Sequence, residues 1–262
     1  MGLGYRQAVQ EEPLAGGYMS RVVRAGDTVR RSAGPWTATT QRLLAHVRAC
    51  GVGWVPEPRG LDEQGREVLS FIEGEVPHAM PAWVWSPAVL TDIARALREW
   101  HDATASFDCT GAVWQSEPRE PAEVVCHWDF APYNCVFRDG RFAGAFDFDL
   151  SAPGPRLWDL AYTAYRFVPL MPPQDDPEAG PGERSPFAWH DGLARADAFL
   201  AAYANGGTPA YSREVLVRAA ADRLATIAAW TDAFAEKTGQ RALAAHGAMY
   251  RNHAGWLLRN VG

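Results

Sequence analysis

The residues best suited to chemistry lie in the stretch 126–134, which reads CHWDFAPYN. His127 and Asp129 form an H-x-D pattern, and Asn134 follows the aspartate by five positions. This is the spacing of catalytic loops that transfer phosphoryl groups, in which the aspartate accepts the proton of an attacking hydroxyl. We therefore expect Asp129 to act as a general base.

A tight turn at Asp139-Gly140 is predicted to place Asn134 near Asp147. An Asp-Gly pair favours a two-residue hairpin turn, and in that register Asn134 lies opposite Ala145 and on the same face as Asp147. Diagonal neighbours of this kind are roughly 7–8 Å apart. An amide oxygen and a carboxylate oxygen are ligands that suit Mg²⁺. The sequence thus predicts a Mg²⁺ site beside a free catalytic carboxylate.

With Gly154 and the run Asp159-Leu160-Ala161, these residues resemble the aminoglycoside phosphotransferase and choline kinase family. The resemblance extends from about residue 14 to the C-terminus and is strongest over 127–162. It implies an α+β, protein-kinase-like fold of two lobes. The N-terminal lobe, residues 1–73, would be small, β-rich and nucleotide-binding, and residues 74–262 would form a larger, mainly helical lobe for catalysis and acceptor binding.

The resemblance also implies a role for each residue of the loop. Asp129 would be the catalytic base, and Asn134 and Asp147 would hold Mg²⁺. His127 would brace the catalytic loop, and Asp159 would anchor it through hydrogen bonds to loop backbone. ATP or GTP would supply the γ-phosphoryl group, and a small-molecule alcohol would accept it.

The elements that must position these residues differ between the two ends of the chain. Residues 21–24 and 28–31 read as a hairpin closed by Gly26-Asp27, the stretch 36–50 as a helix, and 68–72 as a strand. Further on, 89–101 carries an amphipathic helical stripe and strand-like runs occupy 123–150. The run 171–186, rich in Pro, Gly and acidic residues, predicts a loop, and about three helices are expected after residue 189.

The nucleotide is expected to meet a short glycine loop and a hinge. Gly16, Gly17 and Ser20 resemble the family's shortened glycine loop, where backbone N–H groups approach phosphates. Phe71 and Ile72 lie in the segment that resembles the hinge holding the adenine ring.

The cation that grips the phosphates departs from the family pattern. Kinases place a Lys on the third strand, whereas this chain has Arg30 and Arg31 there. Strand alternation favours Arg31 as the clamp, and the alternative is that both arginines are solvated strand charges. The stretch 36–50 contains no Asp or Glu to pair with the clamp, and Gln41 is the nearest polar candidate. Either the arginine is held in another way or the lobe orders on binding nucleotide.

Acceptor selectivity is expected from the helical lobe. Carboxylates would suit an aminoglycoside, whose ammonium groups need anionic partners, and an aromatic ring would suit a sugar or a quaternary amine. The candidates are Asp191, Asp232, Glu236 and Trp230. For any single carboxylate a solvent-exposed helix face is the better explanation, and for most of the aromatic rings the hydrophobic core is.

Three functions remain open from the sequence. The first is an antibiotic kinase of the aminoglycoside type, and the second is a metabolic kinase for choline, a sugar, homoserine or another small alcohol. The third is a nucleotide-binding pseudokinase, suggested by the missing Lys and Glu. The intact set of Asp129, Asn134 and Asp147 argues against the third, because a protein that only binds has no use for the base.

Composition narrows the partners. The chain has 262 residues, and its net charge of −6 disfavours nucleic acid, which requires a basic surface. No run of eighteen apolar residues occurs, so no membrane span is predicted. Its four cysteines form no C-x-x-C pair, which favours reduced thiols in the cytoplasm. A monomer or a homodimer is expected.

Overall fold

The computed structural model describes residues 10–14, 22–77, 80–177, 180 and 182–261. Gly16, Gly17 and Ser20 of the predicted glycine loop lie outside these described residues.

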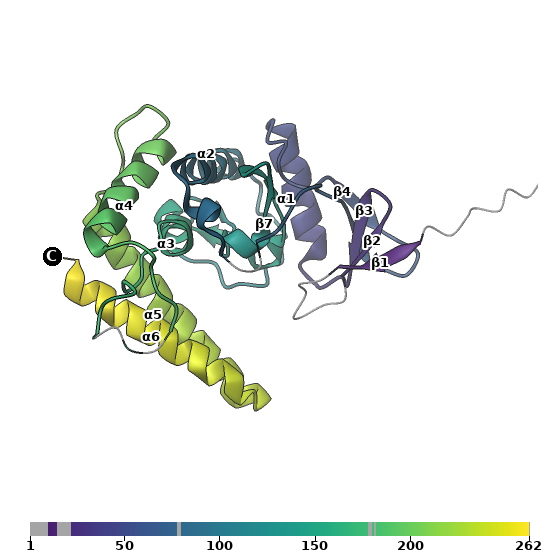
Figure 1. The fold of residues 1–262 in the computed structure, drawn as a ribbon. Coiled ribbons are helices and arrows are strands. Elements are labelled where there is room, and N and C mark those ends of the chain that lie inside the picture. The colour runs from purple at the N-terminus through teal and green to yellow at the C-terminus, as the bar shows by residue number, and fades with distance from the viewer. Residues whose placement is uncertain (1–9, 15–21, 78–79, 178–179, 181, 262) are drawn as a thin grey trace, which may run out of the picture.

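An antiparallel five-stranded sheet forms the N-terminal part of the protein (Figure 1). Its strand order is β1-β2-β3-β5-β4, with β1 at Glu11–Pro13, β2 at Val22–Ala25, β3 at Thr28–Arg31, β4 at Pro58–Leu61 and β5 at Glu67–Ser70. The predicted turn at Gly26-Asp27 closes the β2–β3 hairpin, because Ala25 pairs directly with Thr28.

Helix α1, Thr37–Ala49, follows the third strand as the sequence predicts. Leu43, Leu44 and Val47 are fully buried at helical spacing, so one face of the helix packs into the core. The helix ends before Gly51, whose φ of 94° is a left-handed conformation that favours glycine.

A short crossover connects the sheet to the rest of the molecule. It begins with Phe71 and Ile72 after β5 and reaches Gly74, where an added Cβ atom would lie 2.4 Å from the carbonyl oxygen of Phe137. Only glycine fits there. Glu75 and Phe137 then exchange two backbone hydrogen bonds of 2.8 Å each, so the crossover is fixed against strand β7.

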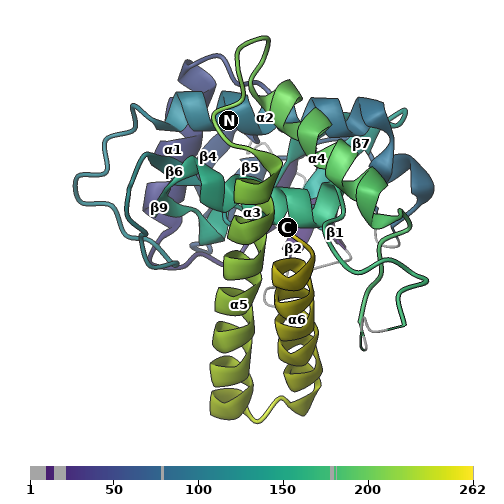
Figure 2. The same ribbon diagram turned by 90° about the vertical axis from the view of Figure 1, so that its left-hand side faces the viewer.

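The rest of the chain is mainly helical, as predicted. The helices are η1 (Ala82–Trp85), α2 (Pro87–Thr104), α3 (Arg156–Phe167), α4 (Trp189–Tyr203), α5 (Arg213–Thr238) and α6 (Arg241–Asn260). Figure 2 shows α5 and α6 as an antiparallel pair that extends beyond the body of the protein. The boundary between residues 73 and 74 stays a prediction. None of the helices in the described residues is long and apolar enough to cross a membrane.

Short elements between α2 and α3 carry the catalytic loop. They are β6 (Val124–Cys126), η2 (Pro132–Asn134), β7 (Cys135–Arg138), β8 (Arg141–Ala145), η3 (Phe148–Leu150) and β9 (Ala152–Gly154). β6 pairs with β9 and β7 pairs with β8. Trp100 and Leu97 of α2 and Leu160 of α3 are fully buried, so the loop rests on a packed core.

Candidate active site

The carboxylate of Asp129 is held by two residues of its own loop. The Tyr133 hydroxyl donates to its Oδ1 at 2.6 Å, and Nδ2 of Asn134 donates to its Oδ2 at 2.8 Å. Asn134 Nδ2 also approaches the Asp129 carbonyl oxygen at 3.0 Å. The single turn η2 brings these donors to the carboxylate, so the carboxylate has a fixed direction.

The surroundings of Asp129 suit a proton acceptor. Loss of solvation raises the pKa of Asp129 to about 6, with the Tyr133 hydrogen bond opposing the rise and the charge of Asp147 adding to it. The preceding Trp128 has a φ of 71°, a strained value for a non-glycine residue of the kind that gathers at functional sites. A carboxylate with such a pKa is ionised at neutral pH and can accept a hydroxyl proton.

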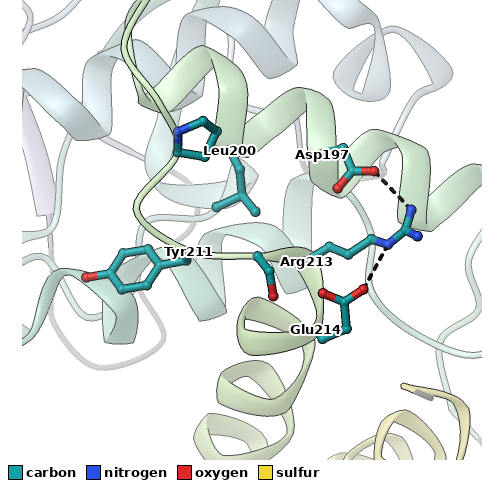
Figure 3. A pocket seen from close by; sticks show the side chains of 7 residues that line it. Asp197, Leu200, Tyr211, Arg213 and Glu214 are labelled. Carbon is teal, nitrogen blue, oxygen red and sulfur yellow. Dashed lines mark hydrogen bonds and ion pairs between the residues drawn. The ribbon is translucent and has the colours of Figure 1, made fainter.

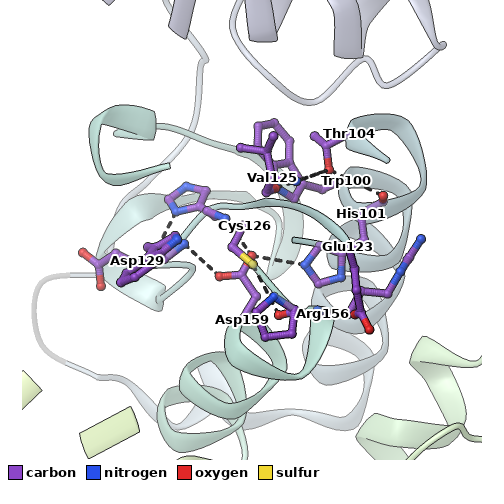
Figure 4. Close-up of polar contacts among 12 residues, drawn as sticks. Trp100, His101, Thr104, Glu123, Val125, Cys126, Asp129, Arg156 and Asp159 are labelled. Atoms are coloured by element: carbon purple, nitrogen blue, oxygen red, sulfur yellow. Dashed lines mark hydrogen bonds and ion pairs between the residues drawn. The ribbon is translucent and has the colours of Figure 1, made fainter. Parts of the chain in front are cut away.

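Asp159 of α3 supports this loop from beneath (Figure 4). Its carboxylate accepts the backbone N–H groups of His127 at 2.6 Å and Trp128 at 2.8 Å, and lies 3.1 Å from Nε2 of His101. Burial opposes ionisation, yet these donors hold the pKa of Asp159 below its ordinary value. The structure therefore puts Asp159 where the sequence expects an anchor for the loop.

Cys126 completes a buried cluster with His101 and Asp159, whose ligand-type atoms all lie within 4.8 Å of one another. The Cys126 thiol donates to the Pro155 carbonyl oxygen at 3.4 Å, and the Asp159 carboxylate already accepts two backbone N–H groups. These contacts favour a structural support over a metal site.

His127 lies fully buried among aromatic rings. Its ring centroid is 4.8 Å from that of Phe148 and 5.3 Å from that of Phe130. Its Nδ1 accepts the backbone N–H of Asp129 at 3.3 Å. Burial lowers the pKa of His127, so the imidazole is neutral and positions the loop without carrying charge.

Arg223 of α5 also holds the catalytic loop. Its Nη2 donates to the Trp128 carbonyl oxygen at 2.8 Å, and its guanidinium carbon lies 5.0 Å from the ring centroids of both Trp128 and Trp158. Sequence reasoning missed this residue, because an arginine on an Ala-rich helix gives no local signal of burial.

The hairpin after the loop differs from the predicted register. Arg138 pairs with Arg141 as expected, but a bulge between Val136 and Phe137 makes Cys135 pair with Ala145 instead of Gly144. The Asn134 carbonyl oxygen consequently accepts the N–H of Phe146, at 3.0 Å. The extra residue on β8 shifts the register by one position, which the turn alone cannot reveal.

The alternation of side chains along β8 therefore does not determine where the Asp147 side chain lies. Its backbone is left-handed, with φ 64° and ψ 61°, so the chain leaves the strand at this residue. The side chain meets Arg31 of the N-terminal sheet, with Nη1 to Oδ1 at 3.2 Å. No hydrogen bond or ion pair joins Asp147 to Asn134 in the described part of the chain.

Arg31 collects three carboxylates around one guanidinium. Besides Asp147, its Nη2 contacts Asp149 Oδ1 at 2.5 Å, and its Nε contacts Glu67 Oε2 at 2.6 Å. Arg30 lies among other partners, with Nη1 3.5 Å from Glu11 and 3.9 Å from Asp62. Arg31 is thus the arginine that faces the predicted metal ligand.

Glu67 of β5 pairs with Arg31 in place of the acid that helix α1 lacks. It lies directly opposite Arg31 across β3 and β5 and is 1% exposed. Gln41 of α1 donates from Nε2 to Glu67 Oε1 at 2.8 Å, and its Oε1 accepts the N–H of Gly60 at 2.9 Å. The arginine is therefore held by a neighbouring strand, with the helix contributing an amide. No local sequence pattern signals this pairing, because it depends on β3 and β5 lying side by side.

The predicted hinge residues lie on the crossover beside the sheet. The backbone N–H of Phe71 donates to the Asp27 carbonyl oxygen at 2.7 Å, and the guanidinium of Arg24 lies 3.9 Å from the Phe71 ring centroid. Ile72 packs near Gly144 of β8, where an added Cβ would meet its side chain at 3.0 Å.

The donor set around Arg31 fits a hard divalent cation. Asp147 and Asp149 offer carboxylate oxygens, and loss of solvation raises the pKa of Asp149. Asn134 uses Nδ2 toward Asp129, which leaves its amide oxygen as a potential ligand. Mg²⁺ prefers such oxygen ligands, and when bound with nucleotide it would neutralise phosphate charge.

The predicted acceptor residues are scattered. Asp191 pairs with His190 in the first turn of α4, and Asp232 pairs with Arg251 between α5 and α6. Glu236 is exposed. Trp230 is 61% exposed and stacks on Phe234 with centroids 5.1 Å apart. Among the described contacts, none of the four predicted residues forms a hydrogen bond, ion pair or ring contact with the catalytic loop.

Comparisons with known proteins show what this chain is similar to. Residues 108–199 match the phosphotransferase enzyme family. The Trifolitoxin immunity protein of Rhizobium leguminosarum bv. trifolii is 39% identical over 147 residues, 53% of this chain and 55% of that protein. The alignment thus spans about half the length of this curated relative.

Two solved structures share the fold over nearly the whole chain. A choline/ethanolamine kinase family protein from Mesorhizobium loti has a TM-score of 0.63 at 18% identity, covering 98% of this chain and 90% of that one. The macrolide 2'-phosphotransferase from Brachybacterium faecium has a TM-score of 0.58 at 17% identity, covering 93% and 91%. With its β-sheet N-terminal part and its helical C-terminal part, the chain has the protein-kinase-like fold of the solved aminoglycoside phosphotransferases and choline kinases, and residues 108–199, which include the catalytic loop, are similar to the phosphotransferase enzyme family.

Proposed function

We propose that this protein transfers the γ-phosphoryl group of ATP or GTP to a hydroxyl of a small molecule. The observation that carries the proposal is the ion pair of 3.2 Å between Arg31 and Asp147. It brings a cation of the N-terminal sheet to the carboxylate that follows the catalytic hairpin. Phosphoryl transfer depends on such positioned charges more than on covalent chemistry by the protein.

The side chains divide the work at this site. Arg31 is bound to three carboxylates, so anionic phosphate oxygens would replace carboxylates at its guanidinium without leaving a bare buried charge, and the carboxylate of Asp147 would hold the metal ion. Asp129 accepts the hydroxyl proton as the oxygen attacks phosphorus. Tyr133 and Asn134 fix the direction of that carboxylate, and Asp159 fixes its backbone.

We infer that the acceptor is an aminoglycoside-like antibiotic or a related small molecule. The name of the trifolitoxin immunity relative supports a protective role, because it describes a protein that confers immunity to a toxin. Such a kinase would act in the cytoplasm, where nucleoside triphosphates are present, as a monomer or a homodimer.

One observation favours the second candidate, a metabolic kinase for another small alcohol. Of the buried charges next to the catalytic loop, the anion Asp159 is already engaged by backbone N–H groups, and the cations Arg166 and Arg223 do not attract a polyamine. The third candidate, a pseudokinase, loses support because Glu67 supplies the acid that the helix lacks.

Mass spectrometry of a substrate panel tests the proposal. The protein is incubated with Mg²⁺ and either ATP or GTP against aminoglycosides, macrolides, choline, sugars and hydroxylated amino acids. Phosphate should be added to at least one acceptor by the natural protein and to none by Asp129→Asn. Equal product from both proteins would remove Asp129 as the base, and nucleotide binding without product from any acceptor would favour the pseudokinase.

A further inference from the structure

A cavity of about 210 Å³ lies at the C-terminal end of α3, away from the nucleotide side. Apolar side chains form most of its wall, and charged side chains gather at one part of it. The lining residues are Met80, Trp85, Met171, Arg166, Glu183 and Arg184. Neither the predicted acceptor residues nor the catalytic residues described above belong to this wall.

Helix α3 connects the cavity to the catalytic base. Asp159, Tyr162 and Arg166 follow one another at intervals of three and four residues, so they lie on one face of the helix. The Tyr162 hydroxyl lies 2.8 Å from that of Tyr133, which donates to Asp129. Arg166 is one turn farther along, a rise of about 5.4 Å. Arg166, a residue of the cavity wall, thus lies one helical turn beyond Tyr162 on the same face of α3.

Arg166 is a buried cation with remaining capacity to bind. It is 8% exposed, and its Nε has no hydrogen-bond partner among the described residues. Its guanidinium carbon lies 5.5 Å from the Tyr133 ring centroid. Its ion pair is with Glu183, Nη1 to Oε2 at 2.8 Å, and the Glu183 side chain is 52% exposed.

The charges of the wall favour an anion over a cation. Two arginines, Arg166 and Arg184, face one glutamate, so the lining carries a net positive charge. A quaternary amine would find Trp85 and Glu183, but it would also meet both guanidinium groups and be repelled. A carboxylate would meet a planar guanidinium that binds carboxylates in a two-pronged geometry.

We propose that this cavity binds the acceptor, and that the acceptor is not a polycationic aminoglycoside but, among the related small molecules, an alcohol carrying both a carboxylate and an apolar group. The carboxylate binds Arg166, and the apolar group packs among Met80, Trp85 and Met171. The Glu183 carboxylate occupies the same position in the free protein and exchanges with that of the acceptor. The proposal rests on the proposed function only where it identifies the ligand as the phosphoryl acceptor. The anion site itself is tested by binding measurements alone.

Three six-carbon probes of equal length test the site: hexanoate, 1-hexanol and hexylammonium. Isothermal titration at pH 7 measures their binding to the natural protein and to three variants. Hexanoate should bind at least tenfold more tightly than hexylammonium. Arg166→Gln should weaken hexanoate at least tenfold, and Glu183→Gln should tighten it severalfold because an internal competitor is removed.

A second cavity supplies the matched control. This larger cavity, about 390 Å³, lies between α4 and the start of α5, where Arg213 contacts Asp197 at 3.0 Å (Figure 3). Arg213→Gln also removes one guanidinium from an ion pair at a cavity wall, and it should leave hexanoate binding unchanged. Equal loss in Arg213→Gln and Arg166→Gln would mean that the effect is a general one of protein charge.

Two results would overturn the proposal. One is tighter binding of hexylammonium than of hexanoate, and the other is weaker hexanoate binding in Glu183→Gln, a change at an exposed position whose folding is checked by circular dichroism. Because no turnover is needed, failure here is separate from failure of phosphoryl transfer. A protein that binds hexanoate as described but phosphorylates nothing would keep the anion site and lose the kinase assignment.

Discussion

Arginines on the two sides of the catalytic loop have opposite surroundings. On the nucleotide side, Arg31 meets the carboxylates of Glu67, Asp147 and Asp149. On the side of helix α5, Arg223 forms no ion pair among the described residues and lies against aromatic rings and a backbone carbonyl. Burial lowers the pKa of Arg223, whereas the pKa of Arg31 is raised by its carboxylates in spite of burial.

This difference separates exchangeable contacts from fixed ones. Anionic phosphates would take the place of carboxylates at Arg31, and the carboxylate that they release would bind Mg²⁺, so the local charge would stay balanced. The contact of Arg223 with the Trp128 carbonyl oxygen has no such replacement, so it serves to hold the loop. The nucleotide side is built for exchange and the loop side for rigidity.

Replacing Asp129 should have the largest effect, because it should lower turnover while leaving nucleotide affinity unchanged. Asp129→Asn should lower kcat by a factor of about 10²–10⁴, the usual contribution of a general base, because an amide cannot accept the hydroxyl proton. Nucleotide affinity should stay within about twofold, since Asp129 bonds to Tyr133 and Asn134 and not to Arg31. Turnover and equilibrium titration with nucleotide measure the two quantities. Parallel loss of both would contradict the separation.

Replacing Asp147 should instead act on nucleotide binding. Asp147→Ala should weaken Mg²⁺-dependent nucleotide binding by about a hundredfold, or about 2.7 kcal/mol, because it removes a metal ligand and a partner of Arg31. Titration with nucleotide at several Mg²⁺ concentrations measures the effect. An unchanged magnesium dependence would exclude Asp147 as a ligand.

The two neighbouring arginines of β3 should differ in nucleotide binding. Arg31→Ala should weaken triphosphate affinity by about tenfold, or about 1.4 kcal/mol, because a charge-assisted contact to phosphate is lost. Arg30→Ala is the matched control and should change affinity by less than about twofold, since its contacts are the 3.5 Å and 3.9 Å pairs with Glu11 and Asp62. The reverse order would assign phosphate binding to the other face of the strand.

Local patterns in the sequence reveal the elements of this fold. The hairpin at Gly26-Asp27, helix α1 and the three helices after residue 189 follow from turn residues and apolar spacing, and the structure contains all of them. The direction of Asp147 does not follow in this way. Its left-handed backbone and the β7–β8 bulge depend on packing against the rest of the protein, which no local pattern encodes.

The partners of the arginines show the same limit. Glu67 lies opposite Arg31 only once β3 and β5 are paired, so its role requires the sheet topology. Arg166 and Arg223 look like surface charges on helices, and their burial depends on how α3 and α5 pack against the catalytic loop. Long-range pairing and burial are the properties that spacing alone does not determine.

The smallest effect should come from the residues that hold Arg31 from behind. Glu67→Gln keeps the shape but removes the charge at a position only 1% exposed, and should weaken nucleotide affinity about threefold. It should also lower the free energy of unfolding by about 1–3 kcal/mol, because the Arg31 guanidinium loses a buried partner.

Gln41→Ala is the companion change and should lower the free energy of unfolding by about 0.5–1.5 kcal/mol, the typical contribution of a neutral hydrogen bond. Urea unfolding compares the free energies of unfolding of the two variants, and nucleotide titration compares their nucleotide affinities. If Gln41→Ala had the larger effect on affinity, helix α1 and not strand β5 would control the arginine. Glu67 of strand β5 would then not replace the acid that helix α1 lacks, and nucleotide affinity would depend on the position of helix α1.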